Sequence, residues 1–136
     1  MKLITRDTDY AIRALRYIAA HKDSIVSVAE LVDRLKIPRP FLRKLLQILN
    51  KEGLLESIKG QGGGFRLCCS ARKIYLVDLM KIFQGDLTLN ECRFKKLLCP
   101  NTKTCLLRKR LNRIEKYVIK ELKSITLASL IGEADE

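Results

Sequence analysis

The sequence has few histidines, few acidic residues and no long apolar run. Its single histidine, His21, lies far from most of the cysteines in sequence, so no plausible base accompanies a cysteine nucleophile and we do not expect an enzyme. No apolar run approaches the roughly eighteen residues of a membrane span, and charged residues interrupt the segment MKLITRDTDYAIRAL too often for a signal peptide. We therefore expect a cytoplasmic protein with no membrane partner.

Length and charge narrow the class of protein further. With 136 residues, the chain is long enough for about one domain. Lysine and arginine total 27 against 15 acidic residues, and the resulting net charge of +12 favours a polyanionic partner. Basic residues that only solvate helix faces are the alternative. The segment 36–51 favours nucleic acid, because it has no acidic residue and contains Lys36, Arg39, Arg43, Lys44 and Lys51.

Apolar residues at helical spacing predict two helices in the N-terminal third. The first spans residues 8–21, with Asp7 or Thr8 available as its N-cap. The second is SVAELVDRLKI, in which Ser27 precedes Glu30 in the pattern of a capping box.

A third helix, PFLRKLLQILNKEG, is expected to begin near Pro40, because proline is tolerated in the first turn of a helix. Its predicted inward stripe is Phe41, Leu42, Leu45, Ile48 and Leu49. A short helix, a brief turn and a helix with a basic outer face form a helix-turn-helix, whose second helix enters the major groove of DNA. The predicted DNA-binding residues of this helix are Arg39, Pro40, Arg43, Lys44 and Gln47.

The segment LLESIKGQGGGFRLCCS predicts two short strands joined by a glycine-rich tip, which is the wing of a winged helix. Glycine lets the backbone approach a minor groove or a phosphate closely. A nucleotide-binding loop is the alternative, but the segment lacks both the Lys-Ser/Thr pair and the dinucleotide spacing. The predicted DNA-binding residues of the wing are Lys59, Gly60, Gln61, Gly62 and Gly63. A further helix, KIYLVDLMKIFQG, ends at Gly85 and closes a DNA-binding domain of residues 1–85.

Three of the five cysteines follow this domain, at Cys92, Cys99 and Cys105. Thiolates gathered near a helix start in a reducing cell usually bind metal, and the spacing C-x6-C-x5-C lacks the C-x2-C pair of most structural zinc sites. The spacing favours an iron-sulfur cluster held by the segment 86–105. Three small apolar filler residues are the alternative, but these cysteines lie among lysines, asparagine and proline, which favour the thiolate form.

The other two cysteines, Cys68 and Cys69, are adjacent in the sequence. Neighbouring residues of a strand point to opposite faces, so this pair is not expected to chelate one ion. We expect both side chains to serve packing.

Residues 106–131 show apolar residues at steps of three and four, which predicts a long helix with an apolar seam. Such a helix beyond a complete domain needs a partner, and the most economical partner is the same helix of a second subunit. A helix that folds back on its own domain is the alternative. The predicted dimerisation residues are Leu107, Leu111, Ile114, Val118 and Ile125, and residues 132–136 are a tail.

Taken together, several segments closely resemble the winged helix-turn-helix regulators that include the iron-sulfur regulator IscR and the nitric oxide sensor NsrR. The resemblance covers nearly the whole chain. It implies a mostly α fold with a small β-wing, a homodimer that binds DNA, and a cluster between the winged domain and the partner's N-terminal helix. The segments that carry it are TDYAIRAL, IPRPFLRKLLQILNKEGLL, KGQGGGFRL, the C-x6-C-P-x4-C segment and ITLASLI.

The fourth cluster ligand differs within this resemblance. IscR-type proteins place a histidine three residues after the last cysteine, where this chain has Arg108. NsrR-type proteins have a carboxylate in the first helix, which corresponds to Asp9. A carboxylate at that position also favours the helix dipole without any ligand role. The first cysteine interval is one residue longer than the commonest pattern. The thiolate count permits a four-iron or a two-iron cluster, and we expect the four-iron form.

The sequence thus predicts a homodimeric, sequence-specific transcription regulator that acts as a repressor on a palindromic operator in double-stranded DNA. Its iron-sulfur cluster would report iron supply, redox state or nitric oxide. The alternative is a clusterless thiol switch on the same fold, in which oxidation of cysteine does the sensing.

Overall fold

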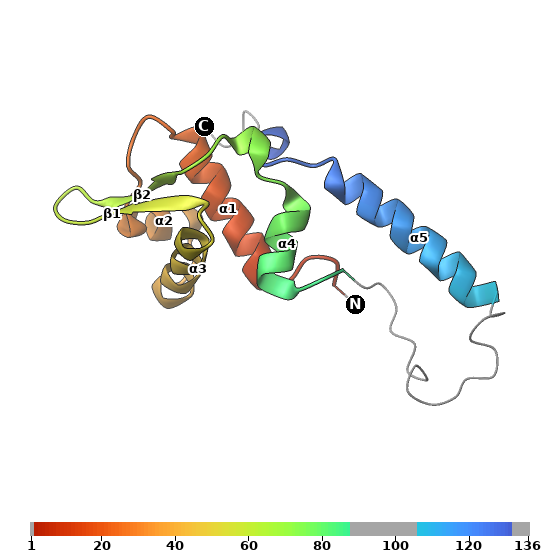
Figure 1. The fold of residues 1–136 in the computed structure, drawn as a ribbon. Coiled ribbons are helices and arrows are strands. Elements are labelled where there is room, and N and C mark those ends of the chain that lie inside the picture. Colours follow the sequence, from red (N-terminus) through yellow and green to blue (C-terminus); the bar gives the residue numbers. More distant parts are fainter. Residues whose placement is uncertain (1, 88–105, 132–136) are drawn as a thin grey trace.

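The computed structural model describes residues 2–87 and 106–131. Within these residues the fold is mostly helical with one two-stranded antiparallel sheet, as the sequence predicts (Figure 1). Two 3-10 turns, η1 (Ala71–Lys73) and η2 (Ala128–Leu130), complete the architecture. The main elements are α1 (Arg6–Ala20), α2 (Val28–Leu35), α3 (Arg39–Lys51), β1 (Leu55–Ile58), β2 (Gly64–Leu67), α4 (Leu76–Gln84) and α5 (Leu106–Lys123).

Helix α1 is the centre of the core. Its residues Ala11, Ala14, Leu15 and Ile18 are fully buried, and they form one stripe at helical spacing. The helix begins earlier than predicted, because Thr5 is the N-cap and its side chain accepts a hydrogen bond from the backbone of a residue three positions later. The expectation of Asp7 or Thr8 as the cap was therefore wrong.

The helix-turn-helix consists of α2 and α3. The capping residue Ser27 accepts a hydrogen bond from the backbone N–H of Glu30 at 3.1 Å, as predicted. Helix α2 ends at Leu35, and its C-cap Lys36 has a left-handed backbone with φ of 57°. The sharp turn that follows runs into Pro38, the N-cap of α3.

The buried stripe of α3 differs from the prediction at Phe41 and at Ile48, which is only half-buried. This ring is 41% exposed, whereas Leu46, which the sequence analysis left out, is fully buried. The reason is helical geometry, because the four buried leucines follow steps of three, one and three along one face and Phe41 lies outside that arc. The buried residues of α3 are Leu42, Leu45, Leu46 and Leu49.

The wing is the hairpin of β1 and β2, which pair from Leu55 with Leu67 to Ile58 with Gly64. A bridge between Val26 and Phe65 fastens the hairpin to the segment before α2, through two backbone hydrogen bonds of 2.9 and 2.8 Å. The predicted wing is confirmed, and the segment before α2 holds β2 near the tip of the hairpin.

The two adjacent cysteines lie in a bend after the end of β2 at Leu67, so the expectation that they belong to a strand was wrong. The pairing of β1 with β2 ends here, and the backbone N–H of Cys68 donates a hydrogen bond to the carbonyl of Leu54 at 3.0 Å. Both thiols are free: Cys69 is half-buried and packs against the core, as expected, whereas Cys68 is exposed, so the expectation that it serves packing was wrong.

Helix α5 extends away from the body of the domain (Figure 1) and ends at Lys123, eight residues before the predicted end at residue 131. The chain leaves the helix because its backbone pairs with the segment before α4. The N–H of Leu76 donates to Ile125 at 3.0 Å, and the N–H of Leu127 donates to Ile74 at 2.8 Å. The side chain of Leu127 is 1% exposed and completes the core.

Candidate nucleic-acid interface

The outer face of α3 is cationic. Arg39, Arg43 and Lys44 are exposed, and within residues 2–87 and 106–131 none of the three has an ion-pair partner. The stripe of buried leucines lies on the opposite side of the same helix, so burial of that stripe orients the cations outward. Pro40 and Gln47 are exposed as well. The structure thus brings the predicted DNA-binding residues of this helix together on its solvent side.

The wing tip supplies a second set of exposed groups. Lys59, Gly60, Gln61 and Gly62 are exposed, and the N–H of Gly63 donates to the carbonyl of Gly60 at 3.0 Å to close the turn. The φ angles of Gly60 and Gly62 are +99° and +73°, which side chains with a Cβ rarely adopt. The glycines of the tip therefore leave backbone accessible beside the exposed side chains of Lys59 and Gln61.

Arg66 is a wing cation that the sequence analysis missed. Its Nε donates to a carboxylate oxygen of Glu56 at 2.7 Å across the hairpin, at the register where these two residues face each other. This hydrogen bond raises the pKa of Arg66. Because Glu56 neutralises Arg66, Lys59 is the wing cation left available for an anion.

A second contact missed from the sequence joins α1 to α3. The guanidinium of Arg6 lies over the ring of Phe41, with its Cζ 4.6 Å from the ring centroid. These residues are far apart in sequence, so no periodic signal could have paired them.

Of the four proposed metal ligands, only Asp9 lies within the residues that the structure describes. Cys92, Cys99 and Cys105 lie outside them. Asp9 lies in the first turn of α1, where its side chain is 44% exposed and its Oδ2 is 3.1 Å from Nε of Arg13. Across residues 2–87 and 106–131, no group of three or more histidine, cysteine, aspartate or glutamate side chains is placed to hold a metal ion.

The predicted dimerisation residues divide into two groups. Leu107 and Ile114 are 67% and 53% exposed on the outer part of α5, and Leu111 is partly exposed between them. Val118 is half-buried against the core of its own chain. Ile125 lies beyond the end of the helix and also packs against that core. The C-terminal end of the predicted seam therefore folds back, whereas its N-terminal end stays uncovered.

Comparison with known proteins identifies the family to which the chain belongs. The model of the Rrf2 family, described as an iron-dependent transcriptional regulator, matches residues 4–133. The chain belongs to the Rrf2 family. It is 30% identical over 129 residues to the protein aau3 of Rhizobium meliloti strain 1021, covering 94% of this chain and 84% of the relative. It is also 32% identical over 125 residues to a protein of Aquifex aeolicus strain VF5 that carries the name of an HTH-type transcriptional regulator, covering 90% and 87%.

Solved structures of the family share the fold. The structure of IscR of T. potens superposes with a TM-score of 0.75 at 24% identity, covering 98% of this chain and 88% of that one. The structure of CymR of B. subtilis, called the global cysteine regulator, superposes with a TM-score of 0.80 at 22% identity, covering 96% and 97%. The chain is accordingly a DNA-binding transcriptional regulator and not an enzyme. In the described part of the chain, no helix is long and apolar enough to cross a membrane.

Proposed function

We propose that this Rrf2 regulator is a cytoplasmic, homodimeric repressor that binds a palindromic operator and senses its signal through an iron-sulfur cluster. The observation that carries the DNA-binding part is the set of exposed cations on α3 that have no ion-pair partner among the described residues, together with a wing tip that exposes glycine backbone and Lys59. Base edges in the major groove are contacted by Arg43 and Gln47, while Lys59 and the wing glycines contact phosphate or the minor groove.

Binding to DNA tests this assignment directly. Arg43→Ala should lose affinity for a duplex selected from a random pool more than for a random duplex of equal length, because a base contact carries sequence information. Lys59→Ala should weaken both duplexes by a similar factor, since a phosphate contact does not distinguish sequences. Fluorescence anisotropy titrations of both variants give these ratios. Unchanged affinity of both variants for both duplexes would disprove the interface.

The sensing part of the proposal assigns Cys92, Cys99 and Cys105 to the cluster, with Asp9 as the fourth ligand from the partner subunit. Three thiolates and a carboxylate are a donor set that suits iron, and the half-exposed Asp9 is open to approach from another chain. To bind iron, the carboxylate of Asp9 must first break its ion pair with Arg13. A bound cluster would supply a group whose gain, loss or reaction with nitric oxide or oxygen reports the signal.

The apolar residues on the outer part of α5 support the dimer. A second copy of this helix would cover Leu107, Leu111 and Ile114, which the protomer leaves wholly or partly exposed. A two-fold dimer places two copies of α3 and two wings on one duplex, which suits a palindromic site.

A clusterless thiol switch is the second candidate function. Among solved relatives of the same fold is CymR of Staphylococcus aureus, whose structure has also been determined in an oxidised form, with a TM-score of 0.74 at 22% identity. This chain has an exposed free thiol at Cys68. Anaerobic purification separates the candidates: a visible absorption band with stoichiometric iron and sulfide supports the cluster, whereas a colourless protein that loses DNA affinity on mild oxidation supports the thiol switch.

A further inference from the structure

Arg6 belongs to α1, but its side chain lies against α3, the helix proposed to enter the major groove. The Cζ of its guanidinium lies over the ring of Phe41, which is in the first turn of α3 between Arg39 and Arg43 in sequence. Both partners are accessible, because the side chain of Arg6 is 59% exposed and Phe41 is 41% exposed. The contact extends the cationic surface of α3 onto the start of α1.

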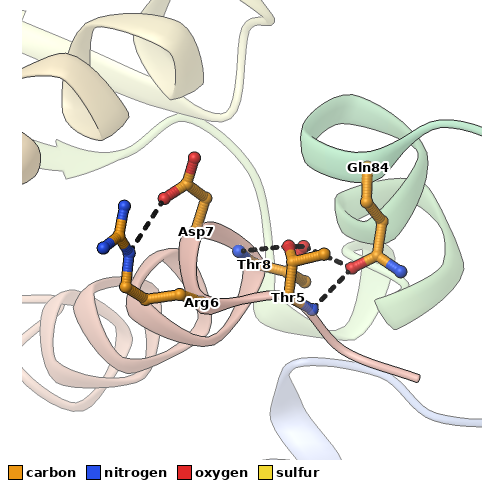
Figure 2. Close-up of polar contacts among 5 residues, drawn as sticks. All are labelled: Thr5, Arg6, Asp7, Thr8 and Gln84. Atoms are coloured by element: carbon orange, nitrogen blue, oxygen red, sulfur yellow. Dashed lines mark hydrogen bonds and ion pairs between the residues drawn. The ribbon is translucent and has the colours of Figure 1, made fainter. Parts of the chain in front are cut away.

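The backbone that carries Arg6 is held in place from the other side. Gln84, the last residue of α4, accepts hydrogen bonds at its Oε1 from the N–H of Thr5 at 3.0 Å and from the hydroxyl of Thr8 at 2.7 Å (Figure 2). The Nε2 of Gln84 donates to the carbonyl of Leu3 at 2.9 Å. These bonds bracket Arg6 in sequence, so its Cα is fixed before any ligand arrives.

A cation–π contact leaves the hydrogen-bonding capacity of a guanidinium largely unused. An aromatic ring offers no strong acceptor to the N–H donors, so they remain available to a phosphate in a bidentate arrangement. The only ion pair of Arg6 among the described residues is with Asp7, at 3.7 Å from Nε to Oδ1. An exposed pair at that distance contributes little and yields readily to a stronger anion.

We infer that Arg6 is a DNA phosphate contact, positioned by Phe41, that extends the interface from α3 onto the first turn of α1. The inference rests on the proposed DNA interface of α3. A purely structural role, in which the stacked pair only holds α3 against α1, is the competing explanation. The two differ in salt dependence, because only a phosphate contact releases counterions from DNA.

The test compares Arg6→Gln with Lys22→Gln in the full chain. Both variants lose one positive charge, but Lys22 is exposed just beyond the opposite end of α1. Anisotropy titrations on a selected duplex and a random duplex, over a range of salt concentrations, give the slope of log K against log salt. We expect Arg6→Gln to weaken both duplexes by the same factor and to reduce the slope by about 0.9 for each subunit that contacts DNA. Lys22→Gln should leave affinity and slope near those of the parent.

Two further variants isolate the role of the ring. Arg6→Lys keeps the charge, so it should keep the slope of the parent while losing part of the affinity. Phe41→Leu keeps an apolar side chain without the aromatic face, and it should weaken binding in the parent but add nothing in the Arg6→Gln background. Such non-additivity shows that the ring acts through Arg6.

Each outcome decides the matter. If Arg6→Gln has the same salt slope as the parent, the phosphate contact is wrong. The same holds if its affinity falls only together with its melting temperature, with no change of slope. Neither outcome contradicts the proposed interface of α3. If the parent protein fails to bind any duplex at low salt, the proposed interface itself is wrong and the inference falls with it.

Discussion

The hydroxyl of Thr8 donates a hydrogen bond of 2.7 Å to Oε1 of Gln84, and this bond joins the first turn of α1 to the last residue of α4. Thr8 is fully buried and is the one buried polar or charged residue within residues 2–87 and 106–131. A buried hydroxyl is stable only with a partner, so the two helix ends are fixed relative to each other. The segment with the three remaining cysteines begins shortly after Gln84 in sequence.

Removal of this hydroxyl should lower stability. Thr8→Val keeps the shape of the side chain but deletes the donor, and we expect the free energy of unfolding to fall by about 1 kcal/mol. Thr8→Ser is the matched control, because it keeps the hydroxyl and loses only a methyl group. Urea denaturation followed by circular dichroism measures the difference. A Thr8→Val protein at least as stable as Thr8→Ser would show that the bond adds nothing.

The attachment of the wing to the helix-turn-helix gives a second prediction. A Cβ on Gly64 would lie 2.3 Å from the carbonyl oxygen of Val26, which belongs to the bridge with Phe65 near the tip of the hairpin. Gly64→Ala should therefore separate β2 from the segment before α2 and destabilise the protein by about 1–3 kcal/mol, as overpacking does. Hydrogen exchange at the N–H groups of Val26 and Phe65 should show loss of protection.

The control for this variant is Gly62→Asn at the wing tip. A side chain there meets open space, and asparagine tolerates the left-handed φ of +73° better than other residues. This variant should lose less stability than Gly64→Ala and keep the protection of the bridge amides, because its only cost is the left-handed backbone. Equal protection of the bridge amides in Gly64→Ala and in the parent would contradict the close contact.

Local signals made the helix-turn-helix and wing predictable from sequence. Ser27 and Glu30 mark the start of α2, Pro38 and Pro40 mark the start of α3, and clustered glycines mark the wing tip. Each of these signals acts within a few residues, so the sequence alone is enough to place the element boundary.

Tertiary contacts account for what the sequence could not predict. Helix α5 stops at Lys123 because residues 125–127 pair with the backbone before α4, and the apolar repeat continues past that point without revealing it. The contact between Phe41 and Arg6 joins residues far apart in sequence, so no local pattern records it. The basic residues of α3 were enough to predict the main candidate DNA-binding surface. The position of Arg6 beside that surface could be recognised only in the folded chain.

The uncovered part of α5 gives a prediction about assembly. Ile114 is 53% exposed in the protomer, and in the proposed dimer it would be buried against the same helix of the partner. Ile114→Asp would then bury an unpaired carboxylate, a cost of several kcal/mol that should dissociate the dimer. Sedimentation velocity measures the change, with Asn112→Asp as the control that adds the same charge elsewhere on α5. A variant at Ile114 as dimeric as the parent would exclude this face as the dimer contact.

The proposed cluster makes the last prediction. Cys92→Ser, Cys99→Ser and Cys105→Ser should each abolish the visible absorption of anaerobically reconstituted protein, because each removes a thiolate ligand. Cys68→Ser, which removes a free exposed thiol from another part of the chain, should keep the full spectrum.

Asp9→Ala should behave differently from the cysteine variants. Carboxylate is a harder ligand than thiolate and should bind iron less tightly, so its loss should leave a cluster that forms but has an altered spectrum or a shorter lifetime in oxygen. Asp7→Ala is the matched control, since Asp7 is also an acidic residue of the first turn of α1. If Asp9→Ala equals the parent in spectrum and oxygen lifetime, the fourth ligand is another group. If the protein lacking all three cysteines still carries the cluster, the sensing proposal fails, and the thiol switch must then be judged by its own oxidation test.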